Sequence, residues 1–180
     1  MLYLFLADGF EEVEAISALD VIRRAGLKVS TVGVTGDVVC GTHGVEIKAD
    51  CTEVDYNDIE GVILPGGMPG TLNLQKSEMV NDALRFCRDN NRLIAAICAA
   101  PMILGELGYL DGRDAVCFPG FEDSLAESNI KSDGVVCDGN YITAKGAGAA
   151  LEFGAAIVDY IAPAVPSKGM SVLKKMQVNI

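Results

Sequence analysis

Cys98 is the residue whose position in the sequence most strongly suggests chemistry. It follows the apolar run 93–97 and precedes Pro101, which lies in the first turn of a predicted helix. Small residues flank it in Ala96-Ile97-Cys98-Ala99-Ala100, as in a nucleophile elbow, because a tight strand-to-helix turn leaves no room for large side chains. A helix N-terminus at the sheet edge favours the thiolate. The pattern is equally typical of a buried structural cysteine, and both interpretations stay open.

Backbone N–H groups near this thiol could stabilise a negatively charged oxygen. One is that of Ala99, at the start of the predicted helix. Others belong to the loop 64–70, with the sequence Leu-Pro-Gly-Gly-Met-Pro-Gly, which follows another buried strand and should reach the same sheet edge. This loop is either the second half of an oxyanion hole or a plain Gly/Pro turn.

Glu14 is the candidate acid. Glu11, Glu12 and Glu14 start a predicted helix, where carboxylates match the helix dipole. Glu14 follows Glu11 by three residues, so one face of this helix could point inward over the sheet edge. A carboxyl and a thiol in contact titrate as a coupled unit, in which one of the two pKa values must rise. A protonated Glu14 donating to a thiolate would produce an acidic, oxidisable cysteine.

The remaining cysteines and the single histidine indicate no metal site, and we expect no metal and no cofactor. No C-x-x-C pair occurs, and His43 alone is too few for a typical zinc site. The segment 146–150 matches a dinucleotide fingerprint only loosely, and close helix–sheet packing is the better interpretation. We expect reduced thiols in the cytoplasm, with five cysteines outside the site: Cys40, Cys51, Cys87, Cys117 and Cys137.

Length and charge limit the classes of protein and partner. The chain has 180 residues, half of them hydrophobic, which predicts a single domain over residues 1–180. A net charge of −11 without a basic stripe argues against nucleic acid and anionic membranes as partners. No apolar run is long enough to span a bilayer, and the opening run 2–6 lacks the basic flank of a signal peptide. That run is predicted to be a buried strand.

Short apolar runs alternate with amphipathic segments, which predicts an α/β fold, a three-layer sandwich with a mostly parallel central sheet. The predicted strands are 2–6, 28–34, 38–40, 45–48, 61–64, 93–97, 115–117, 134–137 and 141–144. The predicted helices are 11–24, 77–90, 101–107, 149–161 and 167–176. This order puts Cys98 and both loops at the carboxyl ends of strands.

Three segments together resemble the ThiJ/PfpI superfamily, and most closely the branch of the Parkinson-associated protein DJ-one. They are 7–14 (ADGFEEVE), 64–67 (LPGG) and 95–101 (AAICAAP), with further matches at 23–26 and 146–148. Their order and spacing agree along nearly the whole chain. The resemblance implies a flavodoxin-like sandwich, a nucleophilic cysteine on a strained elbow and, as in most members, a homodimer.

The resemblance also implies residue roles. Cys98 matches the reactive cysteine and Glu14 the glutamic acid that hydrogen-bonds it. Gly67 and Ala99 match the backbone oxyanion donors, and Gly66 is adjacent to them.

Three further positions are possible pocket residues. Arg24 matches an arginine near the cysteine pocket, and His43 falls near the position of an arginine from the dimer mate. Phe118 replaces a histidine that the family often has before Pro119. Attack on an amide needs an acid to protonate the leaving amine, whereas attack on an aldehyde does not. The missing histidine therefore favours chemistry on dicarbonyls, or a sensor role, over proteolysis.

Two hypotheses follow, and they are not exclusive. The first is a cofactor-free glyoxalase or deglycase in which Cys98 attacks a small dicarbonyl, or its adduct, and Glu14 moves a proton. The second is a redox sensor or chaperone whose Cys98 oxidises to sulfinate. An intracellular cysteine protease or amidase is the weakest alternative. We also expect an apolar stretch at Phe10 and Val13 to be exposed and to suit a dimer.

Overall fold

The computed structural model describes residues 1–179, which form an α/β sandwich around a six-stranded sheet. The sheet order is β2-β1-β5-β6-β10-β9, and every pair is parallel except β10 with β9. Its strands are β1 Leu2–Leu6, β2 Val29–Gly33, β5 Gly61–Leu64, β6 Leu93–Ile97, β9 Val135–Asp138 and β10 Tyr141–Ala144. Two small ribbons pair β3 Val38–Cys40 with β4 Glu46–Lys48, and β7 Asp114–Ala115 with β8 Asn129–Ile130.

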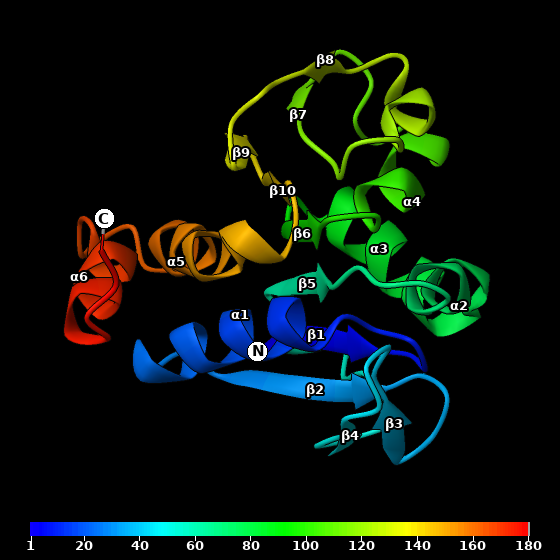
Figure 1. Cartoon of the computed structure of the whole chain (residues 1–180), viewed down its shortest axis with the longest axis horizontal. Helices are drawn as coiled ribbons and strands as arrows, with labels where there is room; N and C mark the ends of the chain where they lie inside the picture. The colour runs from blue at the N-terminus through cyan, green and yellow to red at the C-terminus, as the bar shows by residue number, and fades with distance from the viewer. Residues whose placement is uncertain (180) are drawn as a thin grey trace.

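Helices cover both faces of the sheet (Figure 1). On one side lie α1 Glu12–Arg24, α5 Ala150–Ile161 and α6 Lys168–Lys175; on the other lie α2 Gly70–Lys76, α3 Glu78–Asp89 and α4 Pro101–Glu106. Short 3₁₀ turns span Glu122–Leu125 and Ala147–Ala149. The predicted flavodoxin-like sandwich with a mostly parallel sheet is confirmed.

Strand β1 is buried on both faces, as expected for a central parallel strand. Leu2, Leu4 and Leu6 belong to the core under α1 and α5. Tyr3 and Phe5 belong to the core under α3 and α4. The sheet therefore separates two hydrophobic cores. Each core packs the helices of its own layer against one face of the sheet.

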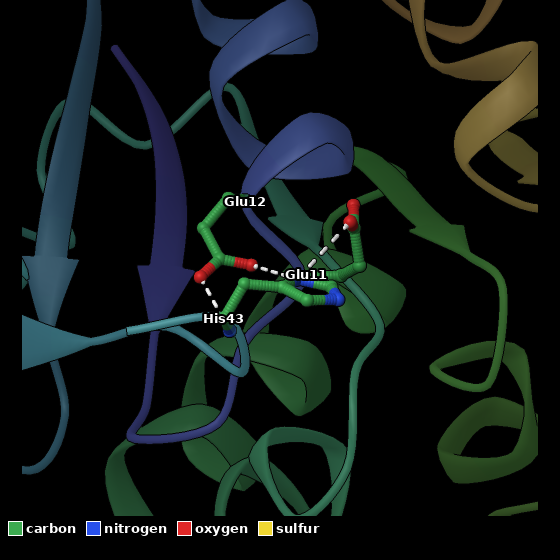
Figure 2. Close-up of side chains that lie close together, drawn as sticks. All are labelled: Glu11, Glu12 and His43. Atoms are coloured by element: carbon green, nitrogen blue, oxygen red, sulfur yellow. Dashed lines mark hydrogen bonds and ion pairs between the residues drawn. The ribbon is translucent and has the colours of Figure 1, made fainter. Parts of the chain in front are cut away.

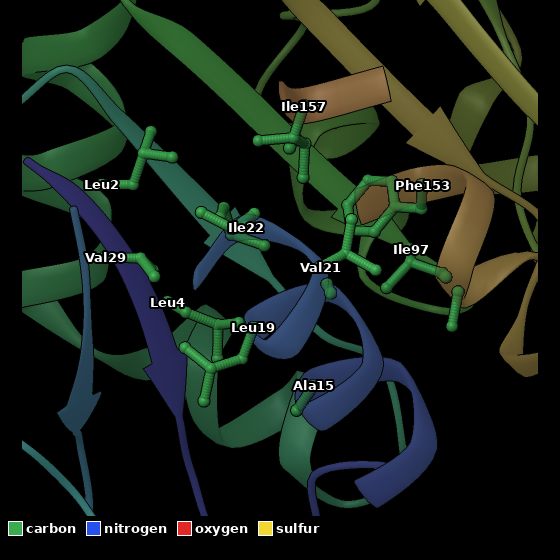
Figure 3. Packing of buried hydrophobic residues seen from close by; sticks show 14 of the residues in the cluster. Leu2, Leu4, Ala15, Leu19, Val21, Ile22, Val29, Ile97, Phe153 and Ile157 are labelled. Carbon is green, nitrogen blue, oxygen red and sulfur yellow. The ribbon is translucent and has the colours of Figure 1, made fainter. Parts of the chain in front are cut away.

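Helix α1 is held in place by the first of these cores. Figure 3 shows Val21 and Ile22 of α1 beside Phe153 and Ile157 of α5, and all four side chains are fully buried. Burying each such side chain stabilises the fold by about 1.5–3 kcal/mol. The start of α1 is thereby fixed over the carboxyl end of the sheet.

Some local expectations were wrong. Helix α2 was not predicted, because its glycine and threonine start lacks helical periodicity, although Leu74 anchors it in the core. Strand β7 covers Asp114–Ala115 rather than 115–117. Phe10 is fully buried, because its segment turns inward between β1 and α1, whereas Val13 is 52% exposed as expected. No helix among residues 1–179 combines the length and the apolar character needed to cross a membrane.

Candidate active site

Cys98 lies on a strained turn between β6 and α4. Its φ is +66°, in the left-handed region that residues other than glycine seldom adopt. Its N–H donates to the carbonyl of Ala144 at 2.8 Å, and its own carbonyl accepts from the N–H of Phe118 at 2.8 Å. These two hydrogen bonds hold the turn from either side and aim the thiol over the sheet edge.

Three groups meet at the Cys98 sulfur. The N–H groups of Ala99 and Gly67 and the side chain of Glu14 lie close enough to the thiol to shift its pKa; the two N–H groups lower the pKa and Glu14 raises it. The two donors come from different loops, one after β6 and one after β5. The structure thus brings together four residues singled out in the sequence, and N–H groups in this arrangement suit a negatively charged oxygen or sulfur.

Glu14 is a buried acid, only 1% exposed. Its Oε2 accepts from the N–H of Gly66 at 2.9 Å, and its N–H donates to Oε2 of Glu11, the N-cap of α1, at 2.7 Å. Burial raises the pKa of Glu14 to about 7, and hydrogen bonds from Cys98 and Gly66 offset only part of the shift. Glu14 can therefore gain or lose a proton near neutrality.

The thiol and the carboxyl compete for one negative charge. Burial, and then the charge of Glu14, raise the pKa of Cys98 to about 12 despite the N–H groups of Ala99 and Gly67. The acidic cysteine expected from the sequence therefore does not exist while Glu14 is charged. A carboxylic acid beside a thiolate has the same total charge as a carboxylate beside a thiol, so the thiolate forms when Glu14 keeps the shared proton.

Gly66 makes this contact possible because it has no side chain. A Cβ at this position would lie 2.6 Å from Cys98 Cβ and 2.7 Å from Glu14 Oε2. We expect Gly66→Ala to push the acid and the thiol apart and to lower the melting temperature by several degrees. Because Glu14 raises the pKa of Cys98, the separation should lower that pKa and raise the rate of Cys98 alkylation near pH 7 by roughly tenfold. Mass spectrometry of alkylated protein and calorimetry would measure the two effects.

Gly148→Ala is the control for the stability of this variant. Its added Cβ would meet no atom within 4 Å, so the melting temperature should stay unchanged. Wild-type alkylation and melting of Gly66→Ala would show that the close approach does not matter.

Phe118 lies beside the thiol and borders a pocket. Its ring is 46% exposed, and the backbone N–H of the same residue bonds the carbonyl of Cys98. The pocket measures about 530 Å³ and is lined by Phe118, Pro119, Gly134, Lys145, Gly146, Ala147, Gly148, Ala149 and Glu152. From the sequence, residues 146–150 were expected only to pack a helix against the sheet. Their contribution to the pocket wall was not predicted, because residues 118 and 146 are distant in the sequence and come together only in the folded chain.

His43 lies beside the acids at the start of α1 (Figure 2). Its Nδ1 is 2.8 Å from Oε2 of Glu12 and 4.0 Å from Oε1 of Glu11, and the imidazole is 71% exposed. The hydrogen bond and charge of Glu12 raise the pKa of His43. Burial opposes ionisation of Glu12, but hydrogen bonds from His43 and the backbone outweigh it and lower the pKa of Glu12.

These three side chains could hold a metal ion, since their ligand atoms lie within 4.8 Å of one another. They already satisfy one another: Glu12 Oε1 accepts from the N–H of His43 at 2.7 Å, and Glu11 caps α1. Among the described contacts, the side chain bonded to the Cys98 sulfur is Glu14 and not His43. The geometry therefore supplies an acid for the thiol and no imidazole.

Arg24 is not near the thiol within this chain, contrary to the expectation. It follows Glu14 by ten residues on the same helix, which separates them by about 15 Å along its axis. Its Nε lies 2.6 Å from Oδ2 of Asp20, and its side chain is 55% exposed. The resemblance to the family placed Arg24 correctly on α1. Within one chain, however, Arg24 lies too far along this helix to reach the Cys98 pocket.

The other cysteines lack these neighbours. Burial raises the pKa of Cys87 to about 12 and that of Cys117 to about 11. Cys137 is exposed, and Cys40 and Cys51 are partly buried. All are free thiols, and the left-handed turn and the buried acid belong to Cys98.

A thiol on a strained strand–helix elbow, at the carboxyl edge of a mostly parallel sheet and bonded to a buried acid, defines a flavodoxin-like protein with a nucleophile elbow. Comparison of the sequence with protein families agrees with this class. The chain belongs to the DJ-1/PfpI family, because the sequence model of that family matches residues 1–160.

Individual relatives cover most of the chain. Protein dj-1beta of Drosophila melanogaster is 38% identical over 164 residues, 88% of each chain. The glutathione-independent glyoxalase DJR-1.2 of Caenorhabditis elegans is 32% identical over 179 residues, 97% of this chain and 94% of the relative. The crystal structure of Drosophila DJ-1beta superposes with a TM-score of 0.89 at 35% identity, covering 99% of this chain and 98% of the other.

Proposed function

We propose that this protein is a cysteine-dependent, cofactor-free enzyme of the glyoxalase or deglycase type, acting on small dicarbonyls or their adducts. The observation that carries the proposal is the convergence of Glu14 and the N–H groups of Ala99 and Gly67 on the Cys98 sulfur. The similarity to a relative named as a glutathione-independent glyoxalase supports it. Both groups that this chemistry requires, a nucleophile and a proton carrier, are present.

The reaction would begin with the arrangement in which Glu14 holds the proton and Cys98 is a thiolate. The sulfur attacks the aldehyde carbon, and the aldehyde oxygen gains negative charge beside the Ala99 and Gly67 N–H groups before it takes the Glu14 proton. The resulting carboxylate removes the hydrogen of the aldehyde carbon as a proton and returns it to the neighbouring carbon, while the hydroxyl proton on the first carbon passes to the oxygen of the second. The first carbon is oxidised and the second reduced, leaving a hydroxyacyl thioester.

Water then cleaves the carbon–sulfur bond, which releases a hydroxy acid and regenerates the thiol pair. One dicarbonyl and one water enter and one hydroxy acid leaves, so no external oxidant or reductant is needed. Conversion of methylglyoxal to lactate by the purified protein, followed by chromatography, tests the proposal. If neither methylglyoxal nor glyoxal yields its hydroxy acid, and no free thiol or amine is released from its glycated adduct, the proposal fails.

Redox sensing is a second candidate, favoured by the same two N–H groups and the buried acid. A protonated Glu14 can donate to a sulfinate oxygen, and the N–H groups can hold its charge. We expect mild peroxide to add two oxygen atoms, about 32 Da, to Cys98 before any other thiol. Intact-mass measurement followed by peptide mapping would locate the addition. Oxidation spread evenly over several cysteines would contradict this role.

Peptidase activity fits the site less well. An amide substrate needs an acid that protonates the departing amine, and Phe118 occupies the position where relatives often carry a histidine. Nδ1 of His43 is 2.8 Å from Oε2 of Glu12, whereas the side chain that influences the Cys98 thiol is that of Glu14.

We also propose a homodimer formed through α1 and the loop before β4. Val13 and Val45 are each 52% exposed and Ile16 is 39% exposed. Val45 lies against this helix, because its N–H is 3.4 Å from Oε1 of Glu12. Exposed apolar side chains on this helix and on the adjoining loop suit a second copy of the chain. In such a dimer, Arg24 could reach a pocket only across the interface.

A charge on this face should disrupt the dimer. We expect Val13→Glu to shift the protein toward a monomer in analytical ultracentrifugation, because a buried, unpaired carboxylate is costly. Leu107→Glu is the control, since Leu107 is similarly exposed but lies at the end of α4, on the other side of the sheet. A wild-type protein that is already monomeric would refute the proposed interface. We further propose a cytoplasmic location, because a chain with six cysteines and no C-x-x-C pair suits a reducing compartment.

A further inference from the structure

The pocket beside Phe118 has a composition unlike that of the thiol site it adjoins. Glycine, alanine, proline and the Phe118 ring form most of its wall, and Lys145 and Glu152 are exposed side chains. Its volume of about 530 Å³ lies within the range of small-molecule sites. Methylglyoxal carries a single methyl group as its substituent, which is too small to fill an apolar pocket of this size.

The pocket lies next to the catalytic acid. A Cβ built on Gly146 would lie 3.2 Å from Cδ2 of Phe118 and 4.0 Å from Oε1 of Glu14, so Gly146 separates the pocket from the acid by little more than one atom. The turn that carries Cys98 is bonded on one side to Phe118 and on the other to Ala144, two residues before Gly146. A ligand attached to the sulfur would therefore have its substituent next to this wall.

Phe118 itself is an unusual surface residue. The residue is 46% exposed, although it carries a large apolar ring. Contact with an apolar substituent would remove that surface from water, at about 25 cal/mol per Å². The histidine that relatives often have at this position would instead offer a polar ring.

We propose that this pocket binds the apolar substituent of the substrate, so that the site prefers α-oxoaldehydes carrying an aryl group, such as phenylglyoxal, over methylglyoxal. The substrate preference rests on the proposed function. The chemistry is unchanged: phenylglyoxal and water give mandelic acid, with the aldehyde carbon oxidised and the ketone carbon reduced. The pocket adds binding energy without taking part in bond making.

Alkylation of Cys98 tests the pocket without relying on turnover. Iodoacetamide and N-benzyl iodoacetamide transfer similar groups to the sulfur but differ by an aryl substituent. We expect the benzyl-to-parent rate ratio at Cys98 to exceed the ratio on N-acetylcysteine by roughly tenfold, from the apolar area that the ring buries. Equal ratios on the two thiols would overturn the proposal.

Substitutions in the pocket wall test whether the benzyl-to-parent alkylation rate ratio at Cys98 depends on this pocket. Gly148→Leu adds a side chain where a Cβ meets no atom within 4 Å, so it can fill the hollow without displacing the backbone. Phe118→Ala removes the ring. Both should bring the ratio toward that of the small thiol, whereas Leu107→Ala, outside the pocket, should keep it high. An unchanged ratio in both wall variants would also overturn the proposal.

Turnover separates this inference from the proposed function. A kcat/KM several-fold higher for phenylglyoxal than for methylglyoxal, lost in Gly148→Leu, supports the substrate preference. Lactate formation without mandelate formation would reject the preference and leave the proposed function intact. If neither acid forms, the proposed function and the preference both fail, and the alkylation ratios alone decide whether the pocket binds apolar groups.

Discussion

Cys98→Ala is expected to abolish the conversion of methylglyoxal to lactate, with a loss of roughly 1,000-fold or more. The other five cysteines cannot replace it, because the left-handed turn, the buried acid and the two N–H donors belong to position 98. Alanine keeps the small volume that the elbow requires, so the fold should survive. Lactate measured by chromatography over a range of protein concentrations checks this result.

Cys137→Ala is the matched control for this loss. Cys137 is an exposed thiol on β9, and its removal should leave turnover within about twofold of the wild type. Circular dichroism of both variants would establish that they fold alike. If Cys98→Ala still formed lactate at the wild-type rate, Cys98 would be a structural cysteine and the proposed mechanism would be lost.

Glu14→Gln is expected to remove the pH dependence of stability between about pH 4.5 and 7, and to stop turnover. Burial raises the pKa of Glu14 from 4.5 to about 7, so the folded protein holds a proton there that the unfolded chain has released. The contribution of Glu14 to stability is therefore greatest below pH 4.5 and is lost as the pH rises through 7. The shift corresponds to about 3 kcal/mol, at 1.36 kcal/mol per pKa unit.

The amide cannot ionise, so the variant should be more stable than the wild type at pH 8 by an amount of that order, even though it carries no proton to the substrate. Melting temperatures between pH 4.5 and 8 would measure the difference. Glu127→Gln is the control, since an exposed carboxyl pays no burial cost and its removal should keep the wild-type slope. A slope that persists in Glu14→Gln would locate the titrating group elsewhere.

Much of the site was predictable because its parts are local. A buried strand, a nucleophile flanked by alanines and a proline-started helix are adjacent in the chain, so their geometry follows from short-range sterics. The loops 7–14 and 64–70 could be placed at the same edge for a similar reason, since parallel strands end together. The resemblance to a known superfamily then paired Glu14 with Cys98.

Properties that depend on distant contacts were missed or wrong. Phe10 looked exposed in the sequence but is buried where its segment turns under α1. Arg24 matched a pocket residue by position, yet it lies a helix length away from Glu14. The pocket wall joins Phe118 to residues 145–149, a pairing that only the hydrogen bonds of the elbow turn create.

The sequence by itself determined the architecture and singled out Cys98 as the candidate nucleophile, because hydrophobic periodicity and close steric packing act over a few residues. Only the tertiary structure decided how Cys98 and Glu14 share their proton. That balance depends on how completely Glu14 is buried, on a glycine that lets its carboxyl approach the sulfur, and on N–H groups from two separate loops. Desolvation and charge act through space, so they exist only once the chain has folded.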